Sequence, residues 1–165
     1  MATMTCPPIR GLVPLDHTCN ATPAVAGQVR LMIDRRIPEW GMTAPRYSEI
    51  RENLALVVTE LVNNAAAETP DREIRIRCFR DFNAPVIRVG VWDSSDRNPE
   101  IAMPELRTET LDLRAENFDD NGGWGLPLVL ALSDSCEVEP TSGGGKWVWA
   151  NISVDGGGRP RQITG

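Results

Sequence analysis

The sequence predicts an α+β fold, a two-layer sandwich in which helices cover one face of a mixed, mostly antiparallel sheet. Two helical patterns come first, a pair of strands follows, and a short helix with two more strands closes the chain. This order lacks the regular strand–helix alternation of a doubly wound sheet. The 165 residues fit one domain, which we place at residues 10–153, with flexible tails at 1–9 and 154–165.

The first half is expected to hold an edge strand and two helices. Residues 9–15 suit a short edge strand limited by its proline. A threonine–proline pair at residue 22 begins the first helix, which a glycine ends near residue 41. The second helix has the clearest pattern in the chain. Its apolar residues recur at spacings of three and four, at Ile50, Leu54, Val57, Val58, Leu61, Val62 and Ala65.

Four strands are expected after the helices. Residues 72–81 alternate between apolar and charged side chains, as a half-buried strand does, and residues 86–92 form an antiparallel hairpin with them. The final strands are placed at 136–139 and 146–152, with a turn between them.

A long connection separates the two strand pairs. Residues 100–121 are acidic and weakly patterned, and we expect them to form a lid. The glycine-rich turn at 122–125 then begins a short helix over 126–132.

The composition excludes several functional classes. A net charge of −6 and an isoelectric point near 4.8 disfavour direct binding of nucleic acid. No signal peptide is visible, and no uncharged apolar run approaches the ~18 residues that a membrane span needs, so we expect a cytoplasmic protein that does not enter a membrane.

The cysteines and the histidine offer little chemistry. The four cysteines form no CxxC pair and suit free thiols in a reducing cytosol. A metal site from Cys6, His17 and Cys19 is the less favoured alternative, because the spacing is irregular and no fourth ligand is evident. His17 is the only histidine and lies near the N-terminus, which gives a Ser-His-Asp triad no support.

Polar residues at four places have the chemistry of a nucleotide site. Glu60 and Asn64 lie one turn apart on the strongest helix, where a carboxylate and a carboxamide can hold a metal ion and position a nucleophile. Asp93 ends an apolar strand, where its carboxylate could accept a hydrogen bond from an exocyclic amine. The glycines at 122–125 let backbone N–H groups approach phosphate at a helix start. Lys146 is a further candidate for phosphate, although solvated or structural roles explain each residue alone.

Together these segments resemble a known family. Residues 56–65 (which include VVTELVNNA), 91–99 (VWDSSDRNP), 123–129 (GWGLPLV) and 145–150 (GKWVWA) resemble, in this order, the N box, two glycine-box regions and the closing strand of the histidine-kinase-like ATPase superfamily. They are most similar to its anti-sigma-factor branch, and IPEWGM at 37–42 matches the end of that branch's first helix. The pattern is neither a P-loop nor a Rossmann fingerprint.

The resemblance implies ATP and Mg²⁺ as cofactors and gives each residue a role. Glu60 would be the general base and Asn64 the magnesium ligand. Asp93, with Ser95 beside it, would accept a hydrogen bond from the adenine amine. The remaining implied nucleotide-binding residues, at or near the phosphates, are Gly123, Gly125, Leu126 and Lys146.

The implied activity is that of a serine/threonine protein kinase. Members of this branch bind a sigma factor and phosphorylate a small antagonist protein, and they are often homodimers. Two departures favour a slower enzyme or a non-catalytic regulator instead. Trp124 stands where arginine is usual, and residues 66–68 (AAE) replace residues that are often basic. A stand-alone ATPase or a fragment of a histidine kinase is a third alternative.

Overall fold

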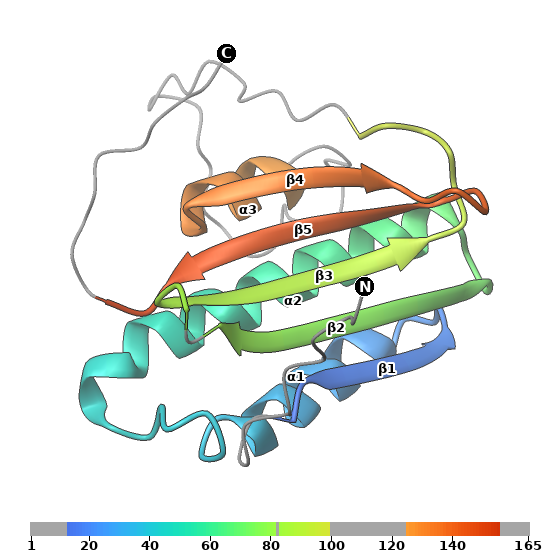
Figure 1. Cartoon of the computed structure of the whole chain (residues 1–165). Helices are drawn as coiled ribbons and strands as arrows, with labels where there is room; N and C mark the ends of the chain where they lie inside the picture. Colours follow the sequence, from blue (N-terminus) through green and yellow to red (C-terminus); the bar gives the residue numbers. More distant parts are fainter. Residues whose placement is uncertain (1–12, 82, 100–124, 156–165) are drawn as a thin grey trace, which may run out of the picture.

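The computed structural model describes residues 13–81, 83–99 and 125–155 (Figure 1). Within these ranges the chain forms five strands and three α-helices, in the order that the sequence predicts. They are β1 (Leu15–Asn20), α1 (Val25–Arg36), α2 (Ser48–Glu68), β2 (Glu73–Asp81), β3 (Val86–Asp93), α3 (Gly125–Leu132), β4 (Ser135–Pro140) and β5 (Lys146–Ser153). A 3-10 turn at Pro45–Tyr47 leads into α2.

The five strands form one sheet in the order β1-β2-β3-β5-β4, and the four pairings between them are all antiparallel. The predicted hairpin of β2 and β3 is confirmed at the centre of this sheet. Because β3 and β5 pair in antiparallel fashion, the end of β3 meets the start of β5. Asp93 therefore lies directly opposite Lys146.

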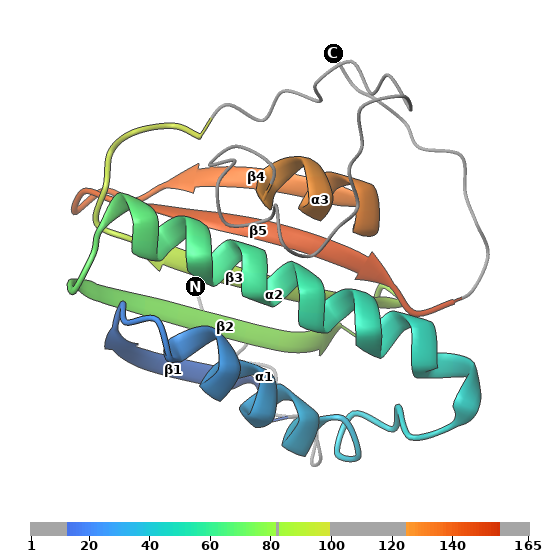
Figure 2. The same cartoon turned by 180° about the vertical axis from the view of Figure 1, so that it is seen from behind.

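The three helices lie on one face of the sheet, as Figures 1 and 2 show from opposite sides, so the predicted two-layer α+β sandwich is confirmed. The long helix α2 crosses the middle of the sheet and contacts α1, α3 and β3. Its predicted apolar stripe faces the sheet, and from Leu54 to Ala65 the six stripe residues are at most 1% exposed. Alternate residues of the central strands complete the core, among them Ile76, Val89 and Val91.

No helix of the described residues lies over the opposite face of the sheet, where arginines cover the tryptophans. Arg75 stacks on Trp92 at 4.8 Å from the ring centre, and Arg88 stacks on Trp149 at 4.6 Å. The Trp149 indole lies directly over Gly90 of the neighbouring strand, where any Cβ would collide with the ring. This packing leaves Trp149 only 7% exposed on a face without helices.

The first strand differs from its prediction. It was expected at residues 9–15, of which 9–12 lie outside the described ranges. The described strand is Leu15–Asn20, which pairs with β2 from Leu15 opposite Cys78 to Asn20 opposite Glu73. Pro14 has no N–H to donate, which agrees with a described ladder that begins at the next residue. Local sequence did not reveal this strand because only Leu15 of its six residues is fully buried.

Several predictions concern residues outside the described ranges, among them the lid at 100–121 and most of the flexible tails. In the part of the chain that the structure describes, no helix is both long enough and apolar enough to cross a membrane.

Candidate functional site

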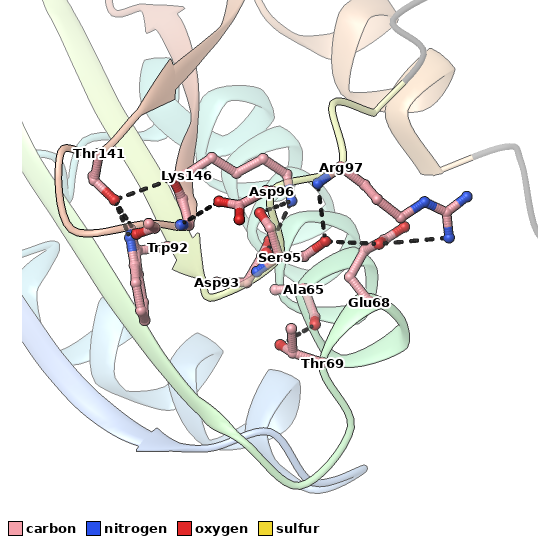
Figure 3. Close-up of polar contacts among 12 residues, drawn as sticks. Ala65, Glu68, Thr69, Trp92, Asp93, Ser95, Asp96, Arg97, Thr141 and Lys146 are labelled. Carbon is pink, nitrogen blue, oxygen red and sulfur yellow. Dashed lines mark hydrogen bonds and ion pairs between the residues drawn. The ribbon is translucent and has the colours of Figure 1, made fainter.

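A buried ion pair lies where β3 ends and β5 begins (Figure 3). The ammonium nitrogen of Lys146 is 2.8 Å from Oδ1 of Asp93 and 3.1 Å from the backbone carbonyl oxygen of Ser95, and it donates to both. Asp93 is 0% exposed and Lys146 is 1% exposed. Taking two charges out of water costs several kcal/mol per ion, so such a pair needs close geometry and additional hydrogen bonds to persist.

Only one of the two carboxylate oxygens of Asp93 accepts hydrogen bonds from the described residues. Its Oδ1 accepts the Lys146 ammonium and also the Ser95 backbone N–H at 2.9 Å. Its Oδ2 is buried and has no hydrogen-bond partner among the described residues, and the same holds for the hydroxyl oxygen of Ser94. A buried acceptor without a donor costs about 1–3 kcal/mol. A buried polar atom without a partner calls for an explanation, of which a group that donates a hydrogen bond from outside the chain is one.

The loop after β3 is tied to the end of α2 by polar contacts. The Ser95 hydroxyl donates to a carboxylate oxygen of Glu68 at 3.3 Å, and a guanidinium nitrogen of Arg97 lies 4.0 Å from the same oxygen (Figure 3). These contacts place Asp93 beside the C-terminal end of α2.

A second set of contacts joins the same loop to the turn before β5. Asp96 accepts the backbone N–H of Gly145 at 2.9 Å. Gly145 has a φ of 76°, a left-handed conformation that favours glycine, and a Cβ there would collide with the Asp93 carbonyl oxygen. The turn therefore requires glycine at position 145, directly before Lys146.

Glu60 and Asn64 lie on α2 and are half-buried, as their predicted position beside the apolar stripe requires. Burial raises the pKa of the Glu60 carboxyl above its ordinary value of 4.5. Glu68 follows Asn64 at the same spacing of four, so the three residues follow one another along one side of the helix. A line of oxygen-bearing side chains therefore leads from Glu60 to the Asp93 region.

The glycine-rich turn falls largely outside the described ranges. Gly123 is not described, whereas Gly125 is the first residue of α3 and Leu126 after it is buried. Helix α3 contacts α2 and lies beside it in Figure 2. A phosphate-binding role for Gly123, Gly125 and Leu126 thus stays a prediction.

Lys146 is buried against Asp93, the residue expected to hold the adenine base. The cause is the register of β3 and β5, which sets the two residues directly opposite one another. The expected role of Lys146 beside phosphate stays a prediction.

Sequence reasoning also missed residues that position the candidate site. Glu68 and Asp96 hold the loop that carries Asp93, and Gly145 shapes the turn before Lys146. The spacing of Glu60, Asn64 and Glu68 was a signal for the first of these. The contact between Asp96 and Gly145 gave no local signal, because it joins residues 49 positions apart.

The alternative metal site of Cys6, His17 and Cys19 finds no support in the described ranges. These ranges contain no group of three His, Cys, Asp or Glu side chains able to hold a metal ion. Of its three residues, Cys6 lies outside those ranges. Cys19 is a free thiol whose pKa burial raises, which disfavours the thiolate that metal binding needs.

The described residues form an open antiparallel sheet with their helices on one face (Figure 2). Residues 19–152 match the family model described as the histidine kinase-like ATPase domain. The match covers most of the chain, which therefore belongs to this family. No protein with curated annotation matches the chain in sequence.

A solved structure shares the fold. It is the crystal structure of the RsbU and RsbW domains of Rv1364c from Mycobacterium tuberculosis, with a TM-score of 0.58 and 18% sequence identity. The similarity covers 93% of this chain and 35% of that one, so this chain spans about a third of the length of its relative.

Proposed function

We propose that the protein binds Mg-ATP beside α2 and transfers the γ-phosphate to a serine or threonine of a small antagonist protein. The observation on which the proposal depends is the buried Oδ2 of Asp93, an acceptor without a donor. An adenine ring supplies such a donor in its exocyclic amine. The family match supports a nucleotide as the ligand.

The residues of α2 suit the other end of the nucleotide. The side-chain oxygen of Asn64 is a hard ligand of the kind that Mg²⁺ accepts. When bound, Mg²⁺ neutralises charge on the phosphates. The half-buried Glu60 carboxylate would accept the proton of the attacking hydroxyl as the new phosphorus–oxygen bond forms and the bond to ADP breaks.

A protein that regulates transcription through partner contacts is the biological role we infer. The sequence motifs of the anti-sigma-factor branch motivate a sigma factor and its antagonist as partners, and the shared fold with a chain that contains an RsbW domain agrees with this role. A homodimer is a further part of the proposal.

A non-catalytic regulator is the second candidate. One observation supports it, because Lys146 neutralises Asp93 within the protein itself and no ligand is needed to balance that charge. Such a protein would bind its partner without phosphorylating it.

Phosphate transfer from labelled ATP to antagonist proteins of the same organism distinguishes the two candidates. We expect Glu60→Gln to reduce transfer about 100-fold or more with little loss of ATP affinity, because general-base catalysis contributes about 10²–10⁴-fold. Glu52→Gln is the matched control, since Glu52 is exposed on the same helix. Wild-type transfer by the Glu60 variant would show that the base is assigned incorrectly, and ATP binding without transfer to any antagonist would favour the regulator.

A further inference from the structure

The Asp93–Lys146 pair leaves two groups unused, one donor and one acceptor. An ammonium group has three N–H donors. Within the described residues, that of Lys146 is bonded to two acceptors, Asp93 Oδ1 and the Ser95 carbonyl oxygen. Its third N–H has no acceptor there, and neither has Asp93 Oδ2 a donor. Both side chains are buried, so water is largely excluded from the two unused positions.

A ligand that satisfies both groups must present an acceptor next to a donor. The edge of adenine has this pattern, because its ring nitrogen N1 accepts a hydrogen bond and its 6-amino group donates one. We propose that Lys146 and Asp93 together recognise this edge, the Lys146 ammonium donating to N1 while Asp93 Oδ2 accepts from the 6-amino group. The inference rests on the proposed function in that the ligand is a nucleotide, and it adds a base-specificity role for Lys146.

The arrangement explains discrimination against 6-oxo purines. Hypoxanthine and guanine carry an oxygen at position 6 and an N–H at position 1, so both groups are reversed. Their oxygen would face the carboxylate and their N–H would face the ammonium. A free carboxylate can bind guanine through both oxygens, but Oδ1 of Asp93 already accepts Ser95 N–H and Lys146.

The choice of lysine also fits this role. Lys146 is the only lysine in the sequence, among 17 basic residues counted as lysine or arginine. An ammonium is a compact donor that fits beside one carboxylate oxygen, whereas the planar guanidinium of arginine bonds both oxygens at once. Arginine here would occupy Oδ2 and leave no acceptor for the base.

Base analogues test the inference on the wild-type protein. The Kd values of ATP, 1-deaza-ATP (in which carbon replaces N1) and purine riboside triphosphate (which lacks the 6-amino group) are measured by calorimetry with Mg²⁺. We expect each analogue to bind about 10- to 100-fold more weakly than ATP, as the loss of one hydrogen bond to a charged group implies. Binding of 1-deaza-ATP within about 2-fold of ATP would overturn the role of Lys146 and leave the proposed function intact. No binding of ATP would overturn both.

A variant and a spectroscopic signal separate recognition from a structural role. In Lys146→Met the penalty for 1-deaza-ATP should fall below about 3-fold, while the penalty for purine riboside triphosphate should remain. Because the chain has one lysine, ¹⁵N-lysine labelling gives one side-chain resonance. We expect ATP to shift this resonance and 1-deaza-ATP to leave it near its free position. Equal shifts with both nucleotides would contradict a hydrogen bond to N1, whether or not the variant folds.

Discussion

Replacing Lys146 by methionine should destabilise the folded protein strongly. The variant keeps most of the side-chain volume but removes the ammonium, so the carboxylate of Asp93 stays buried without its cation. Breaking one partner out of a buried ion pair costs about 3–5 kcal/mol. For a domain of this size, each kcal/mol lowers Tm by about 2–4 °C, which gives an expected loss of about 6–20 °C.

The matched control removes both charges. In the double variant Asp93→Asn, Lys146→Met no uncompensated charge remains, and replacing a whole buried pair by neutral groups is often neutral or stabilising. We expect its free energy of unfolding, from urea titration, to lie within about 1 kcal/mol of the wild type. Two results would refute the view that the two charges stabilise one another away from water. One is a loss of unfolding free energy below about 1 kcal/mol in the single variant, and the other is an equal loss in the single and the double variant.

The remaining predictions concern the turn at Gly145, the proposed general base Glu60 and the thiol of Cys136. Gly145→Ala should lower the Tm and weaken ATP binding, because its φ of 76° and the nearby Asp93 carbonyl oxygen exclude a side chain, whereas Gly143→Ala, in open space, should leave both unchanged. The raised pKa of Glu60 places the low-pH limb of phosphate transfer above pH 4.5, with the rate rising as the carboxyl loses its proton, as a pH profile of kcat will show. The same shift means that folding favours the protonated Glu60 carboxyl. Its contribution to the free energy of unfolding is therefore complete below pH 4.5 and is lost as the pH rises through the raised pKa. Glu60→Gln should accordingly be more stable than the wild type at neutral pH. Burial, with a smaller effect of the Glu137 charge, raises the pKa of Cys136 to about 11, so Ellman's reagent at pH 8 should modify it slowly until guanidinium unfolds the chain.

Much of the fold could be predicted because local patterns repeat across whole elements. The apolar stripe of α2 spans several turns, and the alternation in β2 leaves Ile74, Ile76 and Cys78 buried beside exposed arginines. The first strand gave no such pattern, since it lies at an edge and buries only Leu15 fully. Edge strands depend on hydrogen bonds to a neighbour, which a single sequence does not show.

In the candidate site, too, the local features could be predicted and the long-range contacts could not. The spacing of Glu60 and Asn64 on one helix, and the position of Asp93 at a strand end, are local features that the sequence reveals. The contact of Lys146 with Asp93 joins residues 53 positions apart. It depends on β5 pairing with β3 and on the register of that pairing, so the sequence alone did not predict it.

The most direct test of the account is a calorimetric titration of the protein with ATP, with and without Mg²⁺, for the wild type and for Asn64→Ala and Asp93→Asn. Asn63→Ala is the matched control, because Asn63 is the exposed neighbour on α2. The account predicts Mg²⁺-dependent binding by the wild type and the Asn63 variant, loss of the Mg²⁺ effect in the Asn64 variant, and weak binding by the Asp93 variant. Failure of the wild type to bind ATP at millimolar concentration, or unchanged binding in both site variants, would contradict a nucleotide site between α2 and the end of β3.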